Sequence, residues 1–121
     1  MTNYNLKIVD VKNLSDARRE IQSVGSDPAS IEIMAPKTIS KVVKLSNVVL
    51  QDAIIIKQDM LSIGGEVAVP RDTFKLNQET GDILIIGTLK QLRDLVGKLR
   101  RHYSRIKEIA VDLESLLEGV K

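Results

Sequence analysis

The residues most able to bind a ligand are two glycine-containing stretches and a few lysines. Residues 57–69 read KQDMLSIGGEVAV, where Gly64 and Gly65 separate a helical pattern from a strand pattern. Glycine lets a backbone approach a ligand closely, and Lys57 is near this pair in the sequence. Glycine is also the usual stop of a helix, and a phosphate cradle needs its glycines before a helix rather than after it. A helix end is therefore the favoured interpretation, and ligand contact is the alternative.

The stretch GTLKQ (87–91) has the order that an anion site requires. Gly87 follows an aliphatic run, and Thr88 and Gln91 match the T-x-x-Q capping box that starts a helix. The free amides and the dipole of such a helix attract anions, and Lys90 lies in its first turn. Any strand-to-helix junction offers the same geometry, so the pattern alone is a weak indication of an anion site.

Cationic side chains near predicted strand ends extend this candidate site. If strands 30–35 and 82–88 are parallel, Lys37 lies at the same sheet edge as Gly87, which is where such folds usually bind ligands. The candidates for a cationic pocket are Lys37, Lys57, Arg71 and Lys90. With the glycines included, the predicted ligand-binding residues are Lys37, Lys57, Gly64, Gly65, Gly87, Thr88 and Lys90.

The sequence offers no arrangement for covalent catalysis or metal binding, so we predict no catalytic residue, metal or cofactor. It has no cysteine and one histidine, His102, whereas protein zinc sites need several such ligands. Ser62 has no histidine near it in the sequence, and His102 has no acidic partner within a turn. Asp52 and Asp59 fall on the predicted outer face of one helix, where solvation accounts for them.

Length and composition indicate a single domain over residues 1–121. A hydrophobic content of 43% allows one core. The net charge of +2 does not require nucleic acid, and an aromatic content of 2% disfavours the stacking of bases. We interpret the basic run KLRRHYSRIK (98–107) as a solvated helix junction, because acidic residues follow it. The aliphatic runs are far too short to span a membrane, so a soluble, cytoplasmic protein is expected.

Hydrophobic periodicity divides the chain into alternating strands and helices. The predicted strands are 6–11, 30–35, 66–70 and 82–88, with 41–48 as an edge strand or a loop, and the predicted helices are 13–25, 50–63, 89–99 and 104–120. The strand 82–88 is expected to be buried on both faces. This order predicts a layered α/β sandwich with a mixed, mostly parallel sheet of about four or five strands and about three or four helices.

Three blocks of the sequence resemble a known family. They are SIEIMAPK (30–37), AIIIKQDMLSIGGEVAV (53–69) and DILIIGTLKQLRDLVGKL (82–99). Their order and spacing resemble the N-terminal accessory region that precedes the catalytic barrel in some long bacterial and archaeal dihydropteroate synthases and dihydropteroate-synthase-related proteins. The resemblance covers residues 6–117, which is nearly the whole chain.

The catalytic barrel of that family has no counterpart in this sequence. The strand-end motif N-x-T-x-D-S-F-x-D-G, which identifies the barrel, does not occur, and 121 residues are too few for a barrel of about 250. The segment RRHYSRIKEIA also departs from the family, which often carries a Pro-Phe-Gly turn there. Met1 and the ending GVK favour a free-standing accessory domain over an excised piece.

The resemblance implies a non-catalytic accessory or assembly domain of folate and pterin biosynthesis. Its expected partner is a separate dihydropteroate synthase barrel or a second copy in a homodimer, and an apolar patch is expected on the last helix at Leu116 and Leu117. The alternative is a free-standing protein that binds a pterin or an anionic, phosphorylated metabolite through Lys37 and Lys90. The low aromatic content favours the accessory domain, because few side chains could stack on a pterin ring.

Overall fold

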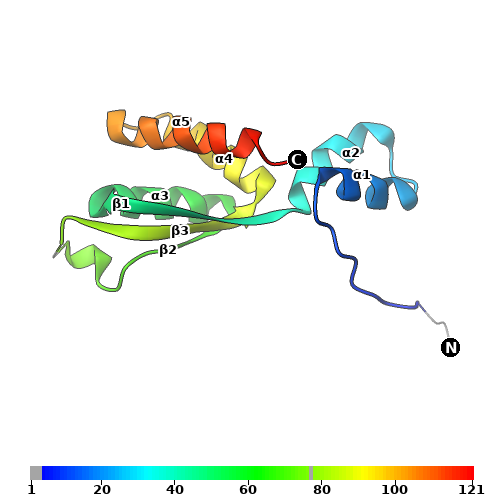
Figure 1. The fold of residues 1–121 in the computed structure, drawn as a ribbon, viewed down its shortest axis with the longest axis horizontal. Coiled ribbons are helices and arrows are strands. Elements are labelled where there is room, and N and C mark those ends of the chain that lie inside the picture. Colours follow the sequence, from blue (N-terminus) through cyan, green and yellow to red (C-terminus); the bar gives the residue numbers. More distant parts are fainter. Residues whose placement is uncertain (1–3, 77) are drawn as a thin grey trace.

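The computed structural model describes residues 4–76 and 78–121 (Figure 1). In chain order the elements are α1 (Leu14–Ser23), α2 (Pro28–Met34), the 3₁₀ turn η1 (Ala35–Lys37), β1 (Ser40–Val49), α3 (Leu50–Ile63), β2 (Glu66–Ala68), the 3₁₀ turn η2 (Thr73–Lys75), β3 (Thr80–Thr88), α4 (Leu89–Leu99) and α5 (Ser104–Glu118). Within these described residues, no helix is both long and apolar enough to cross a membrane.

The strands form a three-stranded antiparallel sheet in the order β1-β3-β2. Val43 of β1 and Val67 of β2 both lie opposite Ile85 of β3. β1 and β2 therefore run in the same direction, as expected for two strands joined by a helix, but β3 inserts between them and runs opposite to both. The α/β class is confirmed, whereas the predicted mostly parallel sheet of four or five strands is wrong.

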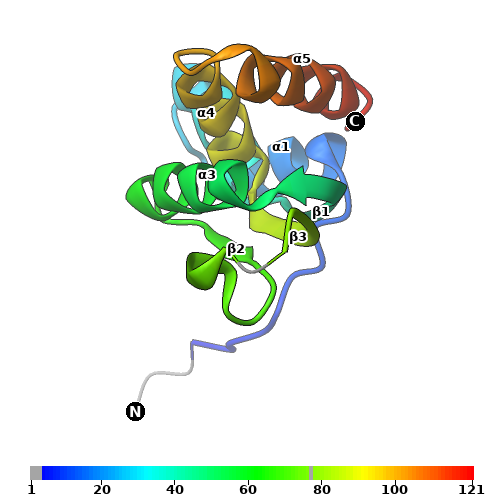
Figure 2. The same ribbon diagram turned by 90° about the vertical axis from the view of Figure 1, so that its left-hand side faces the viewer.

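The three long helices lie on one side of this sheet (Figures 1 and 2). α3 packs against all three strands, α4 packs on β3 and α3, and α5 packs on α4. Ile83 and Ile85 point toward the helices and are buried. Their neighbours along the strand alternate to the opposite face, which we call the outer sheet face and define as Val42, Leu84 and Ile86. Since Ile86 is 38% exposed, the prediction that β3 is buried on both faces is wrong.

Local end signals explain why the long helices match their predicted ranges. α3 ends at Gly64, which has a left-handed φ of 100°. α4 begins with the predicted capping box, in which Thr88 and Gln91 each bind the other's backbone amide through their side chains. α5 starts at Ser104 as predicted. The strand 41–48 is confirmed as the edge strand β1, and strand 66–70 is shorter than predicted.

Two of the predicted strands are wrong. Residues 30–35 belong to α2 and the start of η1, because Asp27 caps the amide of Ala29 and Pro28 occupies the first turn, which together start a helix. Residues 6–11 form neither helix nor strand. Their alternating pattern suits a strand, but a strand also needs a hydrogen-bonded neighbour, and the sheet of the described chain contains only β1, β2 and β3.

α1 and α2 lie beyond one end of the sheet, beside the C-terminus (Figure 1). Asn13 caps α1, since its side chain accepts a hydrogen bond of 2.7 Å from the amide of Asp16. The amide of Leu14 donates to the carbonyl of Lys121 at 2.9 Å. The start of α1 is therefore tied to the end of the chain.

Candidate functional site

The candidate site is a groove of about 400 Å³ between the edge strand β1 and helix α5. Residues 43–49 form its strand wall, and Ile109, Leu113 and Leu116 give its helix wall an apolar surface. Asp52, Arg105, Glu108 and Asp112 add charge to the lining. None of the seven predicted ligand-binding residues lines this groove.

The predicted apolar patch on the last helix is present in part. Leu116 is 56% exposed and lines the groove, whereas Leu117 is only 5% exposed and belongs to the core. Adjacent positions on a helix point in directions about 100° apart, so one faces the groove while the next faces α4 and the core. The helical pattern identifies Leu116 and Leu117 as apolar, but it does not show which of them faces the core and which is exposed.

A buried carboxylate forms the polar part of the groove. The side chain of Asp52 is 2% exposed and accepts two hydrogen bonds from Arg105, from Nε at 2.8 Å and from Nη2 at 2.9 Å. The hydroxyl of Tyr103 also donates to Asp52, and the guanidinium of Arg105 lies 4.9 Å from the centre of the Tyr103 ring. This arrangement pairs a buried negative charge with a planar, two-pronged cation and ties the start of α5 to the start of α3.

These contacts shift the pKa values of all three side chains. Burial by itself would raise the pKa of Asp52, but the hydrogen bonds from Arg105 and Tyr103 outweigh it and hold the pKa below its ordinary value. The hydrogen bond to Asp52 raises the pKa of Tyr103 and, in the same way, the pKa of Arg105. All three shifts favour an ionised Asp52, a protonated Tyr103 and a charged Arg105 at neutral pH, so the cluster suits structural pairing rather than proton transfer.

The prediction that Asp52 and Asp59 are both solvated on the outer face of a helix is wrong. Asp52 is buried, and Oδ2 of Asp59 lies 2.8 Å from Nε2 of His102. His102 was predicted to have no acidic partner within a helical turn. His102, the partner of Asp59, lies in the α4–α5 junction, and Arg105, the partner of Asp52, lies in α5. Each partner is more than forty residues away from its aspartate in the sequence. No local pattern could have identified contacts across that separation.

Ser62 has a polar neighbour but no general base. Its Oγ donates to the carbonyl of Asp59 at 2.6 Å and accepts from Nζ of Lys98 at 2.6 Å. A nucleophilic hydroxyl must give its proton to a base, and here that proton is held by a backbone carbonyl. Within residues 4–76 and 78–121, no group of three or more His, Asp or Glu side chains could hold a metal ion.

The backbone amides at the predicted anion site already have partners. The amide of Leu89 donates to the carbonyl of Ile39 at 2.8 Å, and the amide of Gln91 donates to Oγ1 of Thr88 at 3.1 Å. The amide of Thr88 in turn donates to Oε1 of Gln91 at 2.9 Å. The contact with Ile39 also brings the segment after Lys37 beside the N-terminus of α4. An anion at this helix end stays a prediction, and it would have to displace or share these bonds.

The predicted lysines do not form one pocket around that helix end. Nζ of Lys57 binds Oε1 of Glu66 at 3.0 Å and the carbonyl of Val67 at 2.7 Å, on the side of the sheet where β2 lies. Lys90 pairs with Asp94 at 2.5 Å, and Arg71 is exposed in the connection after β2. Lys37 is also exposed, but in η1, because the strand expected before it is a helix.

The two glycine stretches meet at one tightly packed point. A Cβ at position 65 would lie 2.9 Å from the carbonyl oxygen of Ile86 and would clash with Met60. A Cβ at Gly87 would also clash with Met60 and would lie 2.9 Å from Oε1 of Gln91. Both glycines therefore allow α3 to approach β3 closely. Their proposed contact with a ligand stays a prediction.

Comparison with curated proteins links this chain to folate enzymes. It is 29% identical over 114 residues to the "Bifunctional dihydropteroate synthase/dihydropteroate reductase" of Helicobacter pylori. It is 31% identical over 111 residues to the "Probable bifunctional folylpolyglutamate synthase/dihydropteroate synthase" of Halobacterium salinarum. This chain is a relative of dihydropteroate synthase fusion proteins. The resemblance predicted from the three sequence blocks is thereby confirmed.

The relation covers only part of each dihydropteroate synthase fusion protein. The matches span 94% and 89% of this chain, but 30% of the Helicobacter pylori protein and 13% of the Halobacterium salinarum protein. No family model matches the chain, and no solved structure gives a significant match. The shared segment is therefore a module within larger dihydropteroate synthase proteins, and a three-stranded antiparallel sheet is not a catalytic barrel.

Proposed function

We propose that this chain is an accessory module of folate biosynthesis that acts together with a dihydropteroate synthase barrel. The observation that carries this proposal is the coverage of the Helicobacter pylori relative. The matched 114 residues are 30% of that protein, so roughly 270 residues remain, close to the ~250 of one (β/α)₈ barrel. Both relatives have dihydropteroate synthase in their names, so the shared segment accompanies that activity.

The outer sheet face is the surface that we assign to this barrel. Val42 is 62% exposed and Ile86 is 38% exposed, and the three helices leave this face of the sheet uncovered (Figure 2). Lys44 lies opposite Leu84 and Glu66 lies opposite Ile86 on the same face, so the exposed apolar side chains have charged neighbours. Exposed apolar surface with a polar rim marks interaction sites in soluble proteins. The remaining length of the Helicobacter pylori relative corresponds to a partner of the right size.

Co-purification tests this assignment. The full chain is tagged and co-expressed with the dihydropteroate synthase of its source organism, and the eluted complex is measured by light scattering. Val42→Asp should reduce recovery of the synthase at least tenfold, because a buried charge opposes association. Val111→Asp is the matched control, since Val111 is also 62% exposed but lies on α5. Absence of the synthase with the unsubstituted chain, or equal recovery with both variants, would exclude the assigned contact.

A second candidate function is the binding of a pteridine. The name of the Helicobacter pylori protein includes a second activity, dihydropteroate reductase. The part of that protein outside the match is the size of one barrel and is sufficient for the synthase. The matched segment is then a candidate for the part that binds dihydropteroate for the second activity. Dihydropteroate carries a carboxylate, which the N-terminus of a helix attracts. Lys90 lies in the first turn of α4, and η1, which contains Lys37, packs against α4.

Titration with dihydropteroate distinguishes this second candidate. Lys37→Ala and Lys90→Ala should each weaken binding several-fold without changing thermal unfolding, whereas Lys107→Ala, an exposed lysine of α5, should not. A reduction assay with a nicotinamide hydride donor then asks whether bound dihydropteroate is turned over. Unchanged affinity in both variants would remove the second candidate while leaving the accessory role untouched.

A further inference from the structure

Among the residues that the structure describes, β1 has a neighbouring strand on one edge only. β1 is ten residues long, pairs with β3 on one side, and is the last strand of the sheet on the other. On that side the groove lies between β1 and α5, with Ile109, Leu113 and Leu116 above it. A free edge exposes unpaired backbone groups and readily accepts another strand. The groove is thus a place for an additional strand beneath α5.

The N-terminal arm, residues 4–12, has the side-chain pattern of such a strand. Tyr4, Leu6 and Ile8 are 78%, 89% and 99% exposed. Alternate residues of an extended chain point to the same side, so Leu6 and Ile8 form a short apolar stripe. Asn5 has a left-handed φ of 53°, so Tyr4 lies beyond a turn of the backbone and outside this alternation. An apolar stripe left in water is unfavourable, and burial of it would supply a driving force for association.

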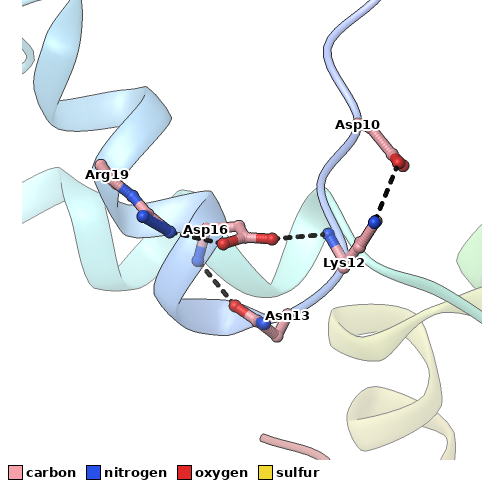
Figure 3. Close-up of polar contacts among 5 residues, drawn as sticks. All are labelled: Asp10, Lys12, Asn13, Asp16 and Arg19. Atoms are coloured by element: carbon pink, nitrogen blue, oxygen red, sulfur yellow. Dashed lines mark hydrogen bonds and ion pairs between the residues drawn. The ribbon is translucent and has the colours of Figure 1, made fainter.

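The base of the arm directs it away from the groove of its own chain. The amide of Lys12 donates to Oδ2 of Asp16 at 3.2 Å, and Nζ of Lys12 lies 3.7 Å from Oδ2 of Asp10 (Figure 3). Asn13 caps the following helix, and Asp16 also binds Arg19, so the chain direction at residues 12–13 is fixed from several sides. From this base the arm extends away from the sheet and from α5 (Figures 1 and 2).

We propose that the arm of one copy adds as a fourth strand to β1 of a second copy. In this position Leu6 and Ile8 point into the groove beneath α5, and the backbone of residues 6–11 pairs with the free edge of β1. Two copies that exchange arms make the same contact twice, which closes the assembly as a symmetric dimer. Direct pairing of one β1 edge with another is disfavoured, because Lys41 and Lys44 place positive charge on both strands.

This inference goes beyond the proposed function and does not depend on it. The arm exchange concerns the groove, whereas the synthase contact concerns the outer sheet face. Light scattering of the purified chain alone therefore tests the dimer, and recovery of the synthase tests the accessory role. Either result can fail while the other holds.

Engineered cysteines identify where the arm binds, on a background that has no cysteine. A chain with Ile8→Cys is mixed with a chain with Leu116→Cys under mild oxidation, and linked peptides are identified by mass spectrometry. The expected result is an 8–116 link between chains at least tenfold more abundant than the link formed with Val111→Cys. Val111 is as exposed as Leu116 but does not line the groove. Equal yields for positions 111 and 116 would overturn the proposal.

The oligomeric state gives an independent result on the full chain. The unsubstituted chain should have twice the 13.4 kDa of one copy, and Ile8→Asp should have the mass of one copy. Because Ile8 is 99% exposed, this change should leave the fold of each copy intact, and Val111→Asp should remain a dimer. A chain that is monomeric without substitution, or a double Ile8→Cys/Leu116→Cys variant that links only within one chain, would overturn the exchange between copies.

Discussion

At the scale of single residues, Asp52 holds together two parts of the protein that are far apart in the sequence. It is buried at the first turn of α3 and is neutralised by Arg105 at the first turn of α5. Removing one partner of a buried pair costs more than the pair itself contributes, because the remaining group has lost its water. Here Arg105 is half exposed, so water can still reach it after the carboxylate is removed.

Replacing Asp52 should therefore destabilise the protein moderately. We expect Asp52→Asn to lower the free energy of unfolding by about 1.5–3 kcal/mol, the range for hydrogen bonds to charged groups. Urea denaturation at pH 7 measures this loss. Glu108→Gln is the control, since Glu108 also lines the groove but is exposed. An unchanged urea midpoint for Asp52→Asn would show that the cluster contributes nothing to stability.

The same carboxylate predicts a pH dependence with a defined sign. The pKa of Asp52 in the folded protein is below its ordinary value of 3.8. Its contribution to stability is therefore complete above that value and is lost as the pH falls through the lower folded pKa. The unsubstituted protein should lose stability below about pH 4 more steeply than Asp52→Asn. Parallel stability curves for the two proteins between pH 2 and pH 5 would contradict the assignment.

Gly65 is a second residue whose identity is set by packing. Gly65→Ala should cost about 1–3 kcal/mol, because its Cβ would press on Met60 and on the backbone of Ile86. Gly97→Ala is the matched control, since nothing lies within 4 Å of its Cβ inside α4, and it should raise stability by up to about 1 kcal/mol. Thermal unfolding measures both variants, and the midpoint should fall for Gly65→Ala and rise for Gly97→Ala. If Gly65→Ala is as stable as the unsubstituted protein, the close approach of α3 to β3 is not required.

At the scale of elements, the sequence predicts those parts whose start and end signals are local. α3, α4 and α5 follow from apolar periodicity combined with Gly64, the Thr88 capping box and the start at Ser104. The segment 30–35 shows the opposite case, because its two alternating isoleucines outweighed the start signal of Asp27 and Pro28. The antiparallel insertion of β3 between β1 and β2 depends on long-range pairing, which periodicity does not specify.

The candidate site was less predictable than the helices for the same reason. The groove is built from β1 and α5, which are separated by more than fifty residues, and its buried ion pair joins Asp52 to Arg105. Of the two residues predicted to form an apolar patch on the last helix, Leu116 lines the groove and Leu117 does not. The predicted strand at 6–11 is wrong, because its alternating pattern specifies which side chains are apolar but does not supply a neighbouring strand in the sheet.

The capping box of α4 provides a test at this scale. Thr88→Ala removes the hydroxyl that accepts a hydrogen bond from the amide of Gln91, and it should lower the free energy of unfolding by about 1 kcal/mol. Thr88→Ser keeps the hydroxyl and should be nearly neutral. Denaturation midpoints of the two variants measure the difference. Because Thr88 is also a predicted ligand contact, a dihydropteroate affinity that falls in Thr88→Ala but not in Thr88→Ser would support the second candidate function.

At the scale of the whole molecule, we assign separate roles to three regions. The inner sheet face and the helices form the core, the outer sheet face is assigned to the synthase barrel, and the groove is assigned to the arm of a second copy. A dimer built in this way presents two outer sheet faces. It would therefore bind two barrels, which predicts a complex with equal numbers of the two chains.

Domain replacement in the Helicobacter pylori relative tests the accessory role most directly. Dihydropteroate synthase activity is compared among the intact enzyme, a form without the matched segment, and a form that carries this chain in its place. We expect the deletion to lower the activity and this chain to restore a substantial part of it. A deletion form as active as the intact enzyme, or a folded replacement form no more active than the deletion form, would rule out the accessory role.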